Sequence, residues 1–211
     1  MKKRKISKKK IIKFVLMLVL IVVLIAGILK YFNNDKPVKK KVKVEDEIKE
    51  YGYKMDDNET AYFKSLFKKL KTTLESKEVD EDEYAKLVSQ LFLADFVNLD
   101  NKLSKNDVGG VQFVYADFQS DFEKLAKEGI YDIVVNKDSG ATSSVDLPNV
   151  TSVEVVNLEH ISHSYLDKTD DDAIKVDLNI TYKEDLDYQK TTSLILVHSD
   201  KKLEIVEMSE Q

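Results

Sequence analysis

The sequence predicts an α+β protein: about three helices packed on a curved, cone-like four-stranded antiparallel sheet, carried behind a single N-terminal transmembrane helix. Three observations support this class. An uncharged apolar run occupies Phe14–Leu29, apolar residues recur at helical spacing between residues 56 and 135, and from Val150 the period changes to two. Because the predicted helices precede the strands, we expect them to be segregated on one side of the sheet.

The apolar run is long enough to cross a bilayer. The sixteen residues of Phe14–Leu29 carry no charge, and apolar neighbours extend the candidate span to residues 14–32. A secretory signal peptide has a shorter core followed by small residues, whereas large residues stand at 29–32. The run therefore predicts an uncleaved signal anchor, with cleavage after Ala26 or Gly27 as the alternative.

The charges beside this span predict its orientation. Residues 1–13 carry eight lysine and arginine side chains, and residues 30–43 carry six. Cytoplasmic segments hold the excess of basic residues, so we expect a single-pass protein of the cell membrane with residues 1–13 in the cytoplasm. The remainder of the chain would then lie outside the cytoplasm.

The part of the chain after the span is acidic. Residues 1–43 hold 14 basic side chains and one acidic one, so the net charge of −5 leaves about −18 on residues 44–211. An acidic domain repels phosphate backbones, and nucleic acid is therefore not an expected partner. The chain has no cysteine, which excludes disulfides and thiolate metal sites. Because no HExxH helix or glycine-rich phosphate loop is present either, we expect no cofactor.

Residues 33–55 are expected to form a stalk with one short helix. Pro37 and the lysines after it disfavour packing and extend the chain. Apolar residues between Val44 and Tyr51 then recur at helical spacing and stop before Gly52.

An extracytoplasmic domain is expected over residues 56–211, beginning with helices. Capping patterns predict them at about 58–76, 81–102 and 117–135, with Asp56, Asp80 and Asp117 near their N-termini. The middle of the second helix is apolar on every side, so this helix should be the most buried. Gly109 and Gly110 predict a tight turn that allows close backbone approach, before a short strand at 111–115.

Four consecutive strands are expected after Pro148, where apolar and polar residues alternate. The predicted strands are Val150–Leu166, Ile174–Tyr182, Thr191–His198 and Lys202–Met208. Adjacent apolar residues at Val155 and Val156 break the alternation and predict a bulge in the first strand. Short connections predict an antiparallel meander.

This order of elements resembles the nuclear transport factor 2-like, or cystatin-like cone, domain. A basic tail, one span, a stalk and then such a domain also resembles the bitopic scaffold proteins of bacterial type IV secretion. Short stretches such as Tyr51-Gly52-Tyr53 are similar to uncharacterised single-span membrane proteins of low-GC Gram-positive bacteria. The resemblance implies a cone-shaped extracytoplasmic domain in a Gram-positive envelope and carries no activity with it.

Asp95 is the most conspicuous candidate for a catalytic group. It falls on the apolar stripe of the second helix, so its carboxyl group must be either paired or protonated. One interpretation is an acid or base with a raised pKa in a pocket. The other is a structural carboxylate bonded to a tyrosine, a lysine or loop amides.

The histidines and one acidic cluster are the remaining candidates for chemistry. His160 and His198 could join Asp95 as catalytic groups, whereas His160 and His163 should point to opposite faces of a regular strand and not share a metal. Metal candidates are carboxylates crowded in one predicted hairpin turn: Asp167, Asp170 and Asp172. They lack EF-hand spacing, and a solvated acidic turn is the competing interpretation.

Two classes of function follow. The first is a non-catalytic scaffold or protein-interaction module at the extracytoplasmic face, with the membrane as one partner through Phe14–Leu29 and an envelope protein or a second copy as the other. The second is a small-ligand binder or a hydratase- or isomerase-like enzyme. In it Asp95, with Tyr131, His160 or His198, would line a cone pocket. The first is preferred because no catalytic constellation is recognisable.

Overall fold

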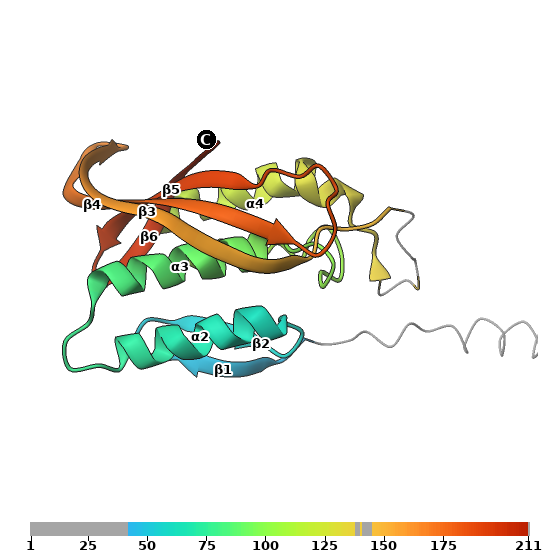
Figure 1. Ribbon diagram of the computed structural model, residues 1–211, viewed down its shortest axis with the longest axis horizontal. Coiled ribbons are helices and arrows are strands. Elements are labelled where there is room, and N and C mark those ends of the chain that lie inside the picture. Colours follow the sequence, from blue (N-terminus) through green and yellow to red (C-terminus); the bar gives the residue numbers. More distant parts are fainter. Residues whose placement is uncertain (1–41, 138–139, 141–144, 211) are drawn as a thin grey trace, which may run out of the picture. The chain divides into compact units, whose positions relative to one another are not determined.

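The computed structural model describes residues 42–137, 140 and 145–210. These residues form a four-stranded antiparallel sheet of order β3-β4-β5-β6, three α-helices and a separate two-stranded sheet, β1-β2 (Figure 1). The strands are β1 Val44–Ile48, β2 Tyr53–Asp56, β3 Val150–Tyr165, β4 Lys168–Tyr182, β5 Thr191–Ser199 and β6 Lys202–Glu210. The helices are α2 Ala61–Leu74, α3 Glu81–Phe96 and α4 Gln119–Glu128. The expected α+β class, with three helices and an antiparallel four-stranded meander, is confirmed.

The predicted span at residues 14–32 lies outside the described residues. Among those that the structure describes, no helix combines the length and the apolar character that crossing a bilayer requires. The span and its orientation stay predictions from the sequence.

Helix α2 begins at Ala61 and is capped by Thr60, not by the predicted Asp56. The Thr60 Oγ1 accepts a hydrogen bond from the Phe63 N–H at 3.1 Å, as an N-cap residue does. Asp56 instead ends strand β2. The predicted apolar stripe is confirmed, because the buried residues of α2 are Phe63, Leu66, Phe67, Leu70 and Leu74.

Helix α3 is the most buried of the three, as predicted. Asp80 caps it by accepting a hydrogen bond from the Glu83 N–H at 3.0 Å, and eleven of its 16 residues are buried. Figure 1 shows α3 running between α2 and the four-stranded sheet. The helix ends at Phe96, not at residue 102, because tertiary hydrogen bonds take over: the Leu99 N–H donates to the Pro148 carbonyl at 3.0 Å.

A β-hairpin stands where a short helix was predicted in the stalk. Strands β1 and β2 pair antiparallel, and Gly52, with a φ of +70°, ends the turn between them. Ile48, Tyr53 and Met55 belong to the main hydrophobic core. The compact domain therefore begins before residue 56, and the predicted boundary is wrong.

The segment between α3 and β3 also departs from the prediction. Val111–Phe113 is a single 3₁₀ turn, η1, and only Val114 pairs with a strand, through a parallel bridge to Ile205. Helix α4 is shorter than predicted and lacks a side-chain cap, so Asp117 is not its N-cap. It is flanked by two further 3₁₀ turns, η2 Ala116–Phe118 and η3 Ile130–Ile133.

The four-stranded sheet follows the predicted order. Strands β4, β5 and β6 are longer than predicted, whereas β3 ends one residue earlier, at Tyr165. The predicted bulge is confirmed by a shift of register between Val155 and Asn157. A second shift falls between Ile161 and His163. Strand β4 already begins at Lys168, so the predicted acidic turn is wrong. Asp170 and Asp172 lie within the strand.

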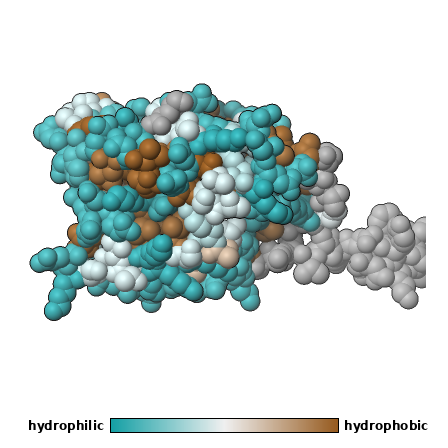
Figure 2. Space-filling model, viewed as in Figure 1, coloured by the Kyte–Doolittle hydropathy of each residue, from teal (hydrophilic) through white to brown (hydrophobic). Residues whose placement is uncertain are grey.

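The helices cover one face of this sheet and leave a second, smaller cluster on the other. The smaller cluster contains Tyr115, Ala173, Ile195 and Val197. The face seen in Figure 2 is mostly hydrophilic, with a few apolar areas between the hydrophilic side chains. This accords with the acidic composition of residues 44–211.

Candidate functional site

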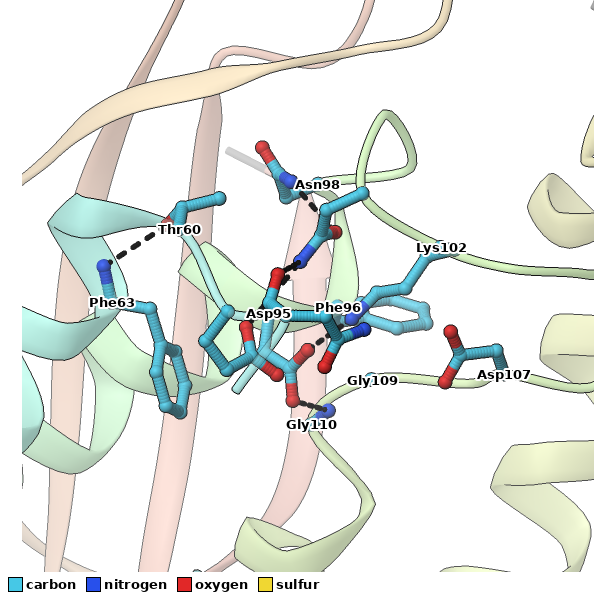
Figure 3. A network of polar contacts seen from close by, with 12 residues as sticks. Thr60, Phe63, Asp95, Phe96, Asn98, Lys102, Asp107, Gly109 and Gly110 are labelled. Carbon is cyan, nitrogen blue, oxygen red and sulfur yellow. Dashed lines mark hydrogen bonds and ion pairs between the residues drawn. The ribbon is translucent and has the colours of Figure 1, made fainter. Parts of the chain in front are cut away.

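Asp95 lies in a closed polar network at the C-terminal end of α3 (Figure 3). Its side chain forms an ion pair with the Lys102 ammonium group, and its second carboxylate oxygen accepts a hydrogen bond from the Gly110 N–H at 2.7 Å. Asp95 is 6% exposed and Lys102 is 2% exposed. These contacts correspond to the second interpretation of Asp95, a structural carboxylate bonded to a lysine and a loop amide.

The two glycines predicted as a tight turn form the wall of this network. Gly110 has a φ of +78°, which favours glycine. A side chain at Gly109 would collide with the Asp95 carboxylate, so the backbone closes directly over it. The Gly109 N–H donates to the Tyr131 hydroxyl at 2.9 Å, and that hydroxyl donates to the Phe96 carbonyl at 2.7 Å. Tyr131 therefore does lie beside Asp95, as the pocket hypothesis requires.

Glu59 is a titratable member of the network that the sequence did not single out. Burial, reinforced by the negative charge of Asp95, raises the pKa of Glu59 to about 7. Burial alone would lower the pKa of Lys102, but the nearby charges of Asp95 and Glu59 outweigh it and raise that pKa. The network therefore holds two carboxyl groups around one buried cation, with Glu59 largely protonated below neutral pH.

The two candidate histidines lie at the opposite end of α3. His160 places its Nδ1 2.7 Å from Asp172 and its Nε2 3.0 Å from Asp82. The first turn of α3 contains Asp82, thirteen residues before Asp95, or about 20 Å along the helix. Asp95 and His160 are thus not parts of one pocket.

His198 makes an equivalent pair of contacts, and its partner on α3 is Glu81, the residue before Asp82. Its Nδ1 lies 2.8 Å from Asp170, and its Nε2 lies 2.8 Å from Glu81. Each of these two rings bridges the first turn of α3 to the beginning of β4, and we call the two arrangements the histidine clamps. Ionised carboxylates only accept hydrogen bonds, so each ring can donate to both of its carboxylates only in its protonated form, and the carboxylates favour that form.

The remaining metal and histidine candidates are dispersed. His163 lies 3.8 Å from Glu207 and shares no partner with His160, in agreement with their predicted separation. Asp170 and Asp172 are occupied by the histidine clamps, whereas Asp167 lies in the β3–β4 turn. Within residues 42–137 and 145–210, no three histidine or carboxylate side chains are gathered as a metal site would need.

An apolar groove lies between α4 and the edge strand β6. It has a volume of about 350 Å³, and we call it the α4/β6 groove. Its lining consists of Phe92, Val114, Phe118, Asp121, Phe122, Leu125, Ile205, Val206, Glu207 and Met208. Leu125 is 68% exposed and Met208 is 37% exposed. Leu125 follows Phe122 by three residues on α4, but its side chain is turned toward solvent at the groove.

The chain matches no protein-family model, no curated protein and no solved structure. The chemistry of the sites is therefore taken from their geometry. The polar atoms of Asp95 and of the clamp histidines are engaged by other side chains or loop amides. The α4/β6 groove, in contrast, exposes large apolar side chains that no other described residue covers.

Proposed function

We propose that the protein is a membrane-anchored, non-catalytic interaction module whose domain binds another protein of the cell envelope at the α4/β6 groove. Residues 14–32 would hold it in the membrane, and the domain would lie at the extracytoplasmic face. In this proposal the buried network and the histidine clamps are structural elements that keep the domain folded.

The groove is the observation that carries the proposal. Burying apolar surface is the main driving force of protein association, at roughly 25 cal/mol per Å². Leu125 is more than two-thirds exposed at the groove, beside the half-buried Phe118 and Phe122. Apolar residues gathered with polar residues at their margin are typical of interaction sites.

The membrane anchor is supported by the sequence. The candidate span at residues 14–32, which contains the uncharged run Phe14–Leu29, has the length of a transmembrane helix, and the basic excess of residues 1–13 favours a cytoplasmic N-terminus. The resemblance to bitopic scaffold proteins points the same way. A cone-like, nuclear transport factor 2-like shape for the domain belongs to this proposal as a fold analogy.

Site-specific photo-crosslinking in intact cells tests the proposal. A photoreactive amino acid replaces Leu125 in the full chain, and in a control chain it replaces Val156, which is 58% exposed on the opposite edge strand β3. We expect a discrete adduct with another protein at Leu125 and none at Val156. Equal labelling at the two positions, or labelling at neither, would contradict an interaction at the groove.

The same cells test the anchor. Deletion of residues 14–29 should release the chain from the membrane fraction and abolish the Leu125 adduct, because the domain would no longer be held beside its partner. Protease added outside the cells should degrade the domain of the intact chain. A domain that stays protected, or a mature chain that begins beyond residue 26, would show that the anchor is wrongly assigned.

A further inference from the structure

Strand β6 leaves part of its backbone without a partner beside the α4/β6 groove. It is the last strand of the sheet. Its outer edge is bonded at Leu203, whose N–H donates to the Tyr84 hydroxyl at 3.2 Å, and at Ile205, whose carbonyl accepts from the Tyr115 N–H at 2.9 Å. Beyond that point the chain turns away into η2. Within the described part of the chain, Val206–Glu210 has backbone pairing with β5 alone.

The opposite edge strand of the sheet, β3, is also bonded by side chains at one point. At Val153 of β3, the N–H donates to the Tyr62 hydroxyl at 2.8 Å, and the carbonyl accepts from the Gln90 amide at 2.8 Å. Side chains from α2 and α3 thus satisfy the backbone of β3 at this point. An unpaired strand edge is a template for another chain, so the open stretch of β6 is a place where a strand can be added.

The two faces of this open stretch demand different side chains. Met208 is paired with Leu194, a fully buried core residue, so its side chain is on the groove side of the sheet. Glu207 is paired with Ile195, which belongs to the smaller cluster on the other face, and beside a shift of register between Ile195 and Leu196 it also reaches the margin of the groove. An added strand would therefore place alternate side chains against an apolar groove and against Glu207.

The acidic residues at the groove determine which kind of added strand would bind favourably. The charged residues that line the groove are Asp121 and Glu207, both acidic, and residues 44–211 carry a net charge of about −18. Pairing β6 with β6 of a second copy would bring two equally acidic domains and four such carboxylates together. Like charges at a strand pair are destabilising, whereas lysine or arginine opposite them is favourable.

We propose that the groove's partner is an extended segment of another protein, alternating apolar and basic residues, which adds as a strand to Val206–Glu210. This inference rests on the proposed function and deepens it by naming the chemistry of the partner. Main-chain hydrogen bonds to β6 would supply affinity, and the apolar groove with its acidic margin would supply specificity.

Synthetic peptides test the inference against the full chain in detergent micelles. The probe is a short fluorescent peptide of alternating valine and lysine, and its matched control alternates valine and glutamate. We expect binding of the lysine peptide alone. Two further lysine peptides carry N-methyl groups on one or the other strand edge; only the isomer whose free edge pairs with β6 should bind.

Matched variants of the protein locate the binding. Leu125→Ser and Glu207→Lys should each weaken the lysine peptide about five-fold or more, since each removes one favourable contact. Ile130→Ser and Glu128→Lys make the same chemical changes at exposed positions outside the groove and should leave binding unchanged. Equal effects of the paired variants, binding of the glutamate peptide or binding of both N-methyl isomers would overturn the inference.

Two outcomes separate this inference from the proposed function. A partner adduct at Leu125 without peptide binding would support the proposed function as an interaction module. It would contradict the inference that the partner adds a basic strand to β6. A dimer in sedimentation equilibrium that Glu207→Lys strengthens would identify a second copy as the occupant and overturn the choice of partner. Peptide binding without an adduct in cells would contradict the proposed function alone.

Discussion

At the scale of single residues, the domain buries a pair of opposite charges beside its hydrophobic core. The Asp95–Lys102 pair is buried, and Gly110 completes the hydrogen bonding of the carboxylate. Removing one partner of a buried pair leaves an uncompensated charge, whereas removing both can be nearly neutral. The pair is thus a test of whether Asp95 is structural.

Lys102→Met should lower the free energy of unfolding by about 3–5 kcal/mol, because the Asp95 carboxylate would stay buried without its cation. Asp95→Asn combined with Lys102→Met should recover most of this loss, since the asparagine oxygen can still accept from the Gly110 N–H. Lys105→Met is the matched control, because Lys105 pairs with Asp132 at the exposed surface. Denaturant unfolding measures the three differences, and equal losses for Lys102→Met and Lys105→Met would contradict a buried, essential pair.

At the scale of elements, the sequence predicts those helices and strands whose formation depends on residues close together in the chain. Helix α3 was predictable from the Asp80 cap and its all-round apolar middle, and the bulge in β3 from Val155 and Val156. Hairpin β1–β2 was not, because helical spacing from Val44 to Tyr51 arose by chance. What decides its structure is the burial of Tyr53, whose hydroxyl bonds that of Tyr84, 31 residues away.

The sites depend still more on distant contacts. The sequence showed that Asp95 needed a partner, but Lys102 reaches it only because α3 ends at Phe96 and the chain turns back. In the histidine clamps, Asp82 lies 78 residues from His160 and Glu81 lies 117 residues from His198. Residue spacing contains no signal for such pairs, since they form only when α3 packs on the sheet.

The histidine clamps predict how α3 responds to pH. Hydrogen bonds to Asp82 and then Asp172 raise the pKa of His160; for His198, burial lowers the pKa but the bonds to Asp170 and Glu81 raise it further. A raised histidine pKa contributes stability that is complete below the unfolded value of 6.5 and is lost as pH rises through the folded value. The clamps should therefore hold α3 to β4 most firmly in mild acid.

NMR titration of the imidazole protons should give values above 6.5 for both rings in the full chain. His160→Gln combined with His198→Gln should increase amide exchange in the first turn of α3 at pH 6 and remove this part of the pH dependence. His163→Gln is the control, because His163 belongs to neither clamp. Exchange that is unchanged by the double variant would show that the clamps do not fasten the helix.

At the scale of the whole molecule, several groups bind protons more tightly in the folded state. Besides the clamp histidines, burial and then Asp95 raise the pKa of Glu59 to about 7 from an ordinary value of 4.5. Between these two values the folded state holds a proton that the unfolded state has lost, so stability falls as pH rises. The net charge of about −18 on residues 44–211 adds self-repulsion in the same direction.

Opposite shifts act only at lower pH. The bond to Lys71 lowers the pKa of Asp46, and for Asp170 the hydrogen bonds from the His198 and Asp172 amides outweigh burial and lower its pKa as well. These carboxylates contribute stability above their unfolded value of 3.8, and it is lost as pH falls through the folded values. The two sets of groups together predict a protein that is more stable in mild acid than at alkaline pH.

Thermal unfolding of the full chain in detergent should accordingly give a higher Tm at pH 5 than at pH 8, and added salt should raise the Tm more at pH 8 because it screens the repulsion. Glu59→Gln mimics the protonated side chain. It should flatten the curve between pH 4.5 and 7 and stabilise the protein at pH 8 by on the order of 2 kcal/mol. Glu128→Gln, at the exposed end of α4, removes the same charge without burial and should change the curve little. If the two glutamine variants behaved alike, the pH dependence would come from net charge, and not from the buried network that Glu59 shares with Asp95 and Lys102.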